Sequence, residues 1–114
     1  MKSYLAGPMR NIPNFNFPAF DLAAERLRSQ GHYVFSPADH DRSVNPEIEN
    51  NPTGSEELAA QTSDWTIRKA LEADTAWICR EAECIALLPG WEKSLGAKAE
   101  WALGVALGLE FWYL

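Results

Sequence analysis

The sequence predicts an α/β fold in which a parallel four-stranded sheet, with strand order 2-1-3-4, carries helices on both faces. Short apolar runs alternate along the chain with longer segments of helical periodicity. Residues 2–6 and 32–35 flank one such helical segment, and strand, helix and strand within about 35 residues indicate a right-handed βαβ unit. Residues 83–88 are apolar enough to form a central strand of a parallel sheet.

The first helix is expected over residues 17–30. The strand before it stops at Gly7 and Pro8, which form a turn. Asn16 is the expected N-cap, and Pro18 lies early in the helix, where proline is tolerated. Gly31 ends the helix as its C′ residue. The apolar residues that recur at helical spacing are Phe20, Ala23, Ala24 and Leu27.

Residues 38–54 are expected to form a long, irregular and mobile loop, because Asp, Asn, Pro and Gly dominate this stretch and apolar residues are few. A loop of this length is uncommon within a compact domain. Two interpretations are open at this point. The segment is either a disordered surface excursion or a lid over a binding site.

The second half of the chain continues the alternation. A helical region is expected from Ser55 to about Arg80, with an interruption near Thr62 and Ser63. The remaining elements are a strand at 83–88, a turn at 89–93, a helix capped by Ser94 that ends at Gly108, and a strand at 109–114. We therefore expect an open three-layer sandwich of the Rossmann or flavodoxin-like kind, as a single domain over residues 1–114.

The composition of the chain restricts the classes of binding partner that we expect. The 114 residues carry a formal net charge of −6, and this argues against a nucleic acid polymer, because phosphate-backbone binding needs a basic surface. The same charge does not exclude a small nucleotide. No apolar run approaches the length that spans a membrane, and Gly7, Pro8 and Arg10 interrupt any signal-peptide core, so we expect a cytoplasmic protein. Cys79 and Cys84 are expected to be free thiols, and no metal or cofactor is expected.

The helix that begins at Ser94 carries the most unusual pattern. Gly96, Glu100 and Gly104 are four residues apart, so they share one helix face. Each glycine costs about 1 kcal/mol relative to alanine in a helix interior, so the space that it leaves needs a reason. One explanation is a closely packed neighbouring strand. The other is a ligand that lies against the backbone, with Glu100 directed at it.

The strand order places a topological switch point between the first and third strands, where open α/β sheets bind ligands. The loops over residues 7–16 and 89–94 converge there. The turn from Gly7 to Arg10 offers backbone N–H groups and a guanidinium to an anion, and the helix start at Ser94 and Gly96 favours negative charge. Asp74 is a candidate fourth group. A phosphate site beside carboxylates suits a sugar phosphate or a nucleotide.

The chain resembles a family of small phage and bacterial proteins known as DUF4406. The motifs that carry the resemblance are Tyr4-Leu5-Ala6-Gly7-Pro8-Met9-Arg10, residues 13–21, Leu88-Pro89-Gly90-Trp91-Glu92-Lys93-Ser94, Gly96-Ala97 and Ala99-Glu100-Trp101-Ala102. More distantly, it is similar to the nucleoside 2-deoxyribosyltransferase superfamily, which includes deoxynucleoside 5′-monophosphate N-glycosidases. Gly7, Asp74 and Glu100 match the glycine turn, the aspartate and the nucleophilic glutamate of those enzymes.

The superfamily resemblance implies that the protein transfers or hydrolyses the glycosyl group of a deoxynucleoside or its 5′-monophosphate. Glu100 is then the nucleophile and Asp74 the proton-transfer group. Arg10, Ser94 and Gly96 would hold the 5′ end, and Phe17 or Trp77 would flank the base. The full set of candidate substrate-binding residues is Tyr4, Gly7, Pro8, Arg10, Phe17, Trp77, Ser94 and Gly96.

Two other functions stay open at this point. The same pocket suits a module that binds a nucleotide without turnover. Alternatively, the apolar end at residues 111–114 suits an interaction protein, since an exposed aromatic sheet edge needs a cover. That edge leads us to expect a homo-oligomer.

Overall fold

The computed structural model describes residues 1–62 and 65–114. Within this part of the chain, one sheet holds four parallel strands in the order β2-β1-β3-β4, and this confirms the predicted topology. The strands are β1 (Lys2–Ala6), β2 (Tyr33–Phe35), β3 (Cys84–Leu87) and β4 (Glu110–Tyr113). β3 is buried along its whole length, as its apolar sequence predicts.

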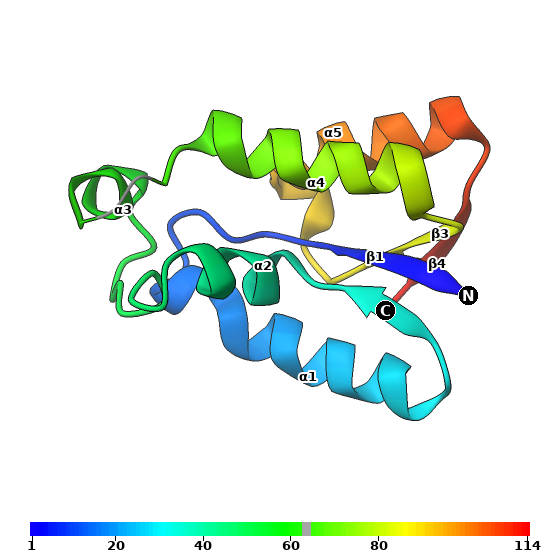
Figure 1. Ribbon diagram of the computed structural model, residues 1–114, viewed down its shortest axis with the longest axis horizontal. Helices are drawn as coiled ribbons and strands as arrows, with labels where there is room; N and C mark the ends of the chain where they lie inside the picture. The colour runs from blue at the N-terminus through cyan, green and yellow to red at the C-terminus, as the bar shows by residue number, and fades with distance from the viewer. Residues whose placement is uncertain (63–64) are drawn as a thin grey trace.

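Helices cover both faces of the sheet, so the three-layer sandwich is also confirmed (Figure 1). One face carries α1 (Phe17–Ser29), and the other carries α4 (Ile67–Glu81) and α5 (Leu95–Leu107). The short helix α3 (Glu56–Thr62) lies beyond the carboxyl ends of the strands, at the left of Figure 1. Single 3₁₀ turns, η1 (Pro13–Asn16) and η2 (Trp91–Lys93), precede α1 and α5.

The predicted interruption of the second helical region is confirmed, because α3 ends at Thr62 and α4 begins at Ile67. Thr66 caps α4 through its hydroxyl oxygen, which accepts a hydrogen bond from the backbone N–H of Lys69 at 3.2 Å. Ser63, the other residue named for the interruption, lies outside the described residues.

Two apolar clusters fill the space on either side of the sheet, and β1 contributes to both. Leu5 packs into the cluster beneath α1, together with Phe20 and Leu27. Tyr4 packs into the cluster beneath α4 and α5, together with Ile78. This alternation follows from the two-residue repeat of a strand. It places Tyr4 on the face where α5 lies.

The expectation of an irregular loop over residues 38–54 is wrong for its first part, because Pro37–Val44 form a helix, α2. Pro37 does end β2, but it also occupies the first turn of the helix, where its fixed φ is favourable. Arg42 anchors α2 through Nη2, which donates to Asp21 Oδ2 of α1 at 2.6 Å, and through Nε, which donates to Glu49 Oε1 at 3.0 Å. Mobility of this segment stays a prediction.

The outer strand β4 forms one edge of the sheet. Tyr113 and Leu114, at its carboxyl end, expose 64% and 47% of their surface. Phe111 and Trp112 are partly buried against the core, so only the last two residues of the apolar end predicted at 111–114 are exposed, and the homo-oligomer that we expect from this end stays a prediction.

The two glycines of α5 have different reasons for lacking a side chain. A Cβ atom at Gly104 would lie 2.6 Å from Ile85 Cδ1 and 3.0 Å from the Phe111 ring, so close packing against the sheet excludes it. A Cβ atom at Gly96 would meet nothing within 4 Å. Of the two explanations left open by the sequence, packing therefore accounts for Gly104, and Gly96 faces open space.

Replacing Gly104 with alanine is expected to lower the free energy of unfolding by about 1–3 kcal/mol, because the new methyl group must displace Ile85 and Phe111. Gly96→Ala is the matched control, and it is expected to raise the same quantity by up to about 1 kcal/mol, since alanine favours the helix and has room. Urea denaturation of both variants and the wild type measures the difference. Equal effects of the two substitutions would contradict this account.

Candidate functional site

A small pocket opens at the carboxyl ends of β1 and β3, and we call it the central pocket. Its walls come from the loop after β1, from α2 and from the first turns of α4 and α5. The cavity volume is about 60 Å³, which is room for a few water molecules. The predicted site residues that line it are Gly7, Arg10, Asp74, Ser94, Gly96 and Glu100.

Two of the predicted carboxyl groups are buried in the wall of this pocket. Glu100, on α5, is 5% exposed, and Asp74, on α4, is 6% exposed. Tyr4, from the central strand β1, donates its hydroxyl hydrogen to Glu100 Oε2 at 2.5 Å. Asp74 Oδ1 is buried and has no hydrogen-bond partner among the described residues. A residue of β1 therefore orients the Glu100 carboxyl group, and Asp74 Oδ1 is left without a hydrogen bond from the described residues.

Burial decides the protonation of these groups. Burial and then the charge of Asp74 raise the pKa of Glu100 to about 8, although the hydrogen bond from Tyr4 acts in the opposite direction. Burial and then the charge of Asp41 raise the pKa of Asp74 to about 7. Burial also raises the pKa of Tyr4 well above its usual value. Near neutral pH the pocket therefore holds protons that exposed carboxyl groups would have released.

Asp41 is a third carboxyl group in the central pocket, and we did not predict it from the sequence. It lies on α2, is 7% exposed and lines the cavity with Asp74 and Glu100. Burial raises its pKa to about 7, although the nearby Trp65 side chain acts in the opposite direction. The signal for Asp41 is the Ser36-Pro37 helix start, which we interpreted only as the end of a strand.

A second pocket adjoins the first and shares Met9, Arg10 and Ser94 with it. Its cavity volume is about 210 Å³, and Pro8 and Lys93 also line it. The N-terminus of α5 lies at this pocket. There the Ser94 hydroxyl oxygen accepts a hydrogen bond from the backbone N–H of Ala97 at 3.2 Å, and this confirms the predicted N-cap.

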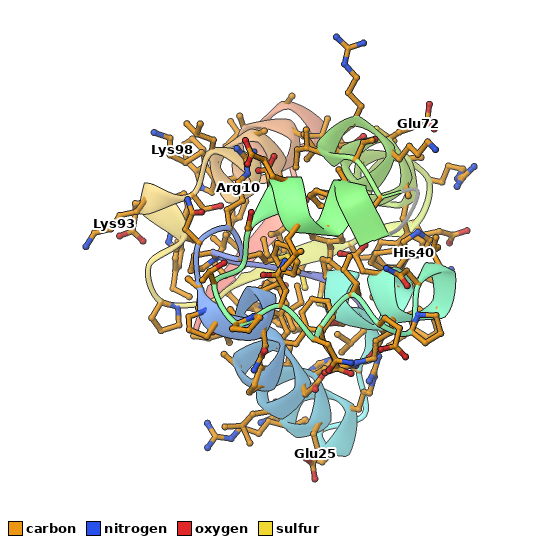
Figure 2. The ribbon with its side chains drawn as sticks, turned by 90° about the vertical axis from the view of Figure 1, so that its left-hand side faces the viewer. Arg10, Glu25, His40, Glu72, Lys93 and Lys98 are labelled. Carbon is orange, nitrogen blue, oxygen red and sulfur yellow. The ribbon has the colours of Figure 1, made fainter. Side chains whose placement is uncertain are left out.

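Figure 2 looks onto the face that carries these pockets, with Arg10 near its centre and Lys93 and Lys98 beside it on one side. Positive side chains and a helix N-terminus on one face suit an anion such as phosphate. Arg10 is not free, however, because its Nε atom forms an ion pair with Glu56 Oε1 of α3 at 2.5 Å. A phosphate that reaches Arg10 competes with this carboxylate.

The loop after β1 has an uncommon backbone. Asn14, Phe15 and Asn16 have φ angles of 56°, 52° and 61°, so three consecutive residues are left-handed. Phenylalanine rarely adopts this conformation, and such residues cost about 1–3 kcal/mol and gather at functional sites. The turn directs Phe15, which is 3% exposed, into the wall of the central pocket.

Hydrogen bonds hold this loop in place. The Asn14 N–H donates to the Asn51 carbonyl oxygen at 2.8 Å, and Asn16 Nδ2 donates to the Pro8 carbonyl oxygen at 3.0 Å. Asn16 does occupy the N-cap position of α1, as predicted, but its side chain makes no capping hydrogen bond there. That part of the prediction is wrong, because the side chain ties the loop to Pro8 instead.

A family model described as Domain of unknown function (DUF4406) matches residues 1–113. The chain belongs to the DUF4406 family. No match was found among curated proteins or among solved structures.

Two residues that we expected beside the base lie elsewhere in this DUF4406 domain. Phe17, the first residue of α1, is fully buried, with the Arg42 guanidinium 4.9 Å from its ring centre. Trp77 stacks on Phe35 at 5.0 Å between ring centres and lines a different surface pocket, next to Tyr33. Neither of them is in the described lining of the central pocket, where Phe15 and Trp65 supply the aromatic walls.

Other features of the DUF4406 domain bear on its chemistry. Cys79 is exposed and Cys84 is buried, and both are free thiols. Among the described residues, no group of His, Cys, Asp and Glu side chains is arranged to hold a metal ion. A search of the same residues for a helix with the length and apolar character of a membrane span finds none.

Proposed function

We propose that this DUF4406 protein cleaves the N-glycosidic bond of a deoxynucleoside or its 5′-monophosphate, as an N-glycosidase or a deoxyribosyltransferase. The observation that supports it most is the pair of buried carboxyl groups, Glu100 and Asp74, in one pocket with Tyr4 bonded to Glu100. Glycosyl transfer through a covalent intermediate uses two carboxyl groups in different protonation states. The similarity to the nucleoside 2-deoxyribosyltransferase superfamily is part of this proposal.

In the proposed first step, the ionised Glu100 carboxylate attacks C1′ of the sugar as the C1′–N bond breaks. The departing base takes a proton from Asp74, and a glycosyl ester forms on Glu100. In the second step, water or a second base attacks C1′ and loses a proton to Asp74, and the Glu100 carboxylate leaves. The chain thus returns to its starting state.

The protonation states of the two carboxyl groups allow these steps. The reactive form carries a proton on Asp74 and none on Glu100. Buried carboxyl groups that interact share their protons, so this form belongs to the singly protonated state of the pair near neutral pH. It is the less populated form of that state, because the pKa of Glu100, about 8, is higher than that of Asp74, about 7. The hydrogen bond that Tyr4 donates to Glu100 increases its share.

The adjoining pocket would take the 5′ end. Arg10 and Lys93 supply positive charge there, and the capped N-terminus of α5 supplies unpaired backbone N–H groups. Gly96 faces open space at the border of the central pocket, which allows the sugar to approach the backbone of α5. A 5′-phosphate in this position replaces Glu56 as the partner of Arg10.

Glu56→Gln is therefore expected to tighten binding of a deoxynucleoside 5′-monophosphate about three- to tenfold, since the phosphate no longer competes with a carboxylate for Arg10. Binding of the matching deoxynucleoside, which has no phosphate, is expected to change little. Titration calorimetry measures both affinities. Glu57→Gln, on the exposed side of the same helix, is the control and is expected to leave them unchanged.

A second candidate function is a module that binds a nucleotide without turnover. One observation favours it. The raised pKa of Glu100 keeps much of this group protonated at neutral pH, and a protonated carboxyl group is not a nucleophile. For either function, the central pocket is small, at about 60 Å³, so a base enters only when a wall residue moves.

One assay separates the two functions. The purified protein is incubated with a panel of deoxynucleosides and their 5′-monophosphates, and free base is measured by mass spectrometry. Release of base by the wild type that is absent from Glu100→Ala supports the glycosidase or transferase. No release, together with a thermal shift caused by a nucleotide, supports the binding module. Neither release nor shift contradicts both.

A further inference from the structure

The carboxyl group of Asp41 has no role in the proposed mechanism, although it lines the same cavity as the reacting groups. It is 7% exposed, and its helix α2 packs against α1 and α4. The neighbouring Arg42 pairs with Asp21 and Glu49, so its guanidinium is directed to other carboxylates. Among the described residues, Asp41 is therefore held at the pocket without an ion pair to a lysine or arginine.

The three carboxyl groups have an order in space. They come from three different helices: Asp41 from α2, Asp74 from α4 and Glu100 from α5. α4 packs against α5 on one side and against α2 on the other. Asp74 therefore comes from the helix that lies between the other two. In the proposed mechanism, Glu100 contacts C1′ of the sugar, and Asp74 lies beside the base, on the side of its glycosidic bond. Asp41 then lies toward the outer edge of the base, which is the edge away from the sugar.

The buried carboxyl groups of the central pocket are hydrogen-bond acceptors when ionised. They are Asp41, Asp74 and Glu100, and the hydroxyl hydrogen of Tyr4 is already used on Glu100. A carboxylate has two oxygens and several acceptor positions, so Asp41 can accept a hydrogen bond from a ligand. Asp74 Oδ1 has no hydrogen-bond partner among the described residues. A ligand that fills this pocket must bring N–H or O–H donors, because buried acceptors without donors are costly.

The other walls of the pocket suit a flat ring. Phe15 and Trp65 lie with their ring centres 5.8 Å apart, and Ile48 adds an aliphatic surface that is 3% exposed. Aromatic and aliphatic walls around a few polar groups are typical of pockets that bind planar ligands. The strained turn at residues 14–16 holds Phe15 in this position.

We propose that Asp41 recognises the base of the substrate, and that it selects a nucleobase with an exocyclic amino group on its outer edge. The inference rests on the proposed function, since it assigns the base to the central pocket. An ionised Asp41 accepts a hydrogen bond from the amino group of adenine or cytosine. Hypoxanthine and uracil present a carbonyl oxygen at the same place, and this oxygen would face a carboxylate with no hydrogen between them.

The test is a set of binding titrations at pH 8 with two matched pairs of probes. These are 2′-deoxyadenosine against 2′-deoxyinosine, and 2′-deoxycytidine against 2′-deoxyuridine. Every protein in the set carries Glu100→Gln, so that no probe is consumed. We expect the amino member of at least one pair to bind at least about tenfold more tightly than its oxo partner.

Two variants assign this preference to Asp41. Asp41→Asn offers a donor as well as an acceptor, so the preference is expected to fall to about threefold or less. Asp41→Leu offers neither, so binding of the amino probe is expected to weaken at least about tenfold. Asp39→Asn, on the same helix and partly exposed, is the control and is expected to keep the full preference. Thermal unfolding confirms that each variant is folded.

The outcomes distinguish this inference from the proposed function. Binding of the probes without an amino preference, or a preference that survives Asp41→Asn, overturns the role of Asp41 and leaves the proposed function standing. Failure of all four deoxynucleosides and of their 5′-monophosphates to bind overturns the proposed function and the inference with it.

Discussion

Replacing Glu100 with glutamine is expected to reduce the release of free base at least about a thousandfold, because the amide cannot form the glycosyl ester. The fold is expected to survive, since Glu100 is buried and largely protonated, and glutamine has the same shape. The carbonyl oxygen of the new amide can still accept the hydrogen bond that Tyr4 donates to Glu100 at 2.5 Å. Single-turnover kinetics with detection of the base by mass spectrometry measure the loss.

The control for this prediction is Glu92→Gln, an exposed glutamate in the turn before α5. It removes one formal negative charge in the same way and is expected to leave the rate of base release unchanged. Nucleotide affinity of the Glu100→Gln variant is expected to stay within a few-fold of the wild type. Base release by Glu100→Gln at the wild-type rate would show that Glu100 is not the nucleophile.

The second prediction concerns pH and stability. The carboxyl groups of Asp41, Asp74 and Glu100 have pKa values of about 7, 7 and 8 in the folded protein, and ordinary values near 4 apply in the unfolded chain. Between these values the folded state keeps protons that the unfolded state has released. Raising the pH through this range therefore favours unfolding.

We expect the melting temperature to fall by at least about 10 °C between pH 5 and pH 8, because at about 1.4 kcal/mol per pKa unit even one of these groups contributes a few kcal/mol, and each kcal/mol corresponds to several degrees for a domain of this size. Scanning calorimetry in buffers of constant ionic strength measures this slope. Glu100→Gln removes one of the three titrating groups, so its slope is expected to be shallower and its melting temperature at pH 8 higher than that of the wild type. A flat profile would contradict the raised pKa values.

The fold could be predicted because its signals are local. β1 and β3 are short apolar runs bounded by turns, and Gly31 and Gly108 mark where helical periodicity ends. The βαβ rule then fixes the handedness, and the central position of β3 follows from its lack of polar residues. None of these steps depends on contacts between residues distant in the sequence.

The candidate site could be predicted only in part, because it depends on which way each element faces. Gly96 and Gly104 look alike in the sequence, and only the positions of Ile85 and Phe111 separate their roles. Phe17 begins α1, and its ring points into the core rather than toward the pocket. These distinctions depend on packing between elements, which a single sequence does not encode locally.

Asp41 was missed for a different reason. A polar stretch after Pro37 has the composition of a loop. The contacts that hold α2 are tertiary: Ala38 is buried in the core, and Arg42 pairs with Asp21 and Glu49. Tertiary contacts therefore override a weak local helix signal in α2. The carboxyl group of Asp41 reaches the pocket only because this helix forms.

The left-handed turn at residues 14–16 has a consequence for the thermodynamics of ligand binding. Its φ angles and its hydrogen bonds to Pro8 and Asn51 fix the Phe15 wall before any ligand arrives. The loss of conformational entropy for this wall occurs during folding and not during association. Phe15 thus acts as a preorganised surface, and a planar ligand that packs on it gains the contact without an ordering penalty from this side of the pocket.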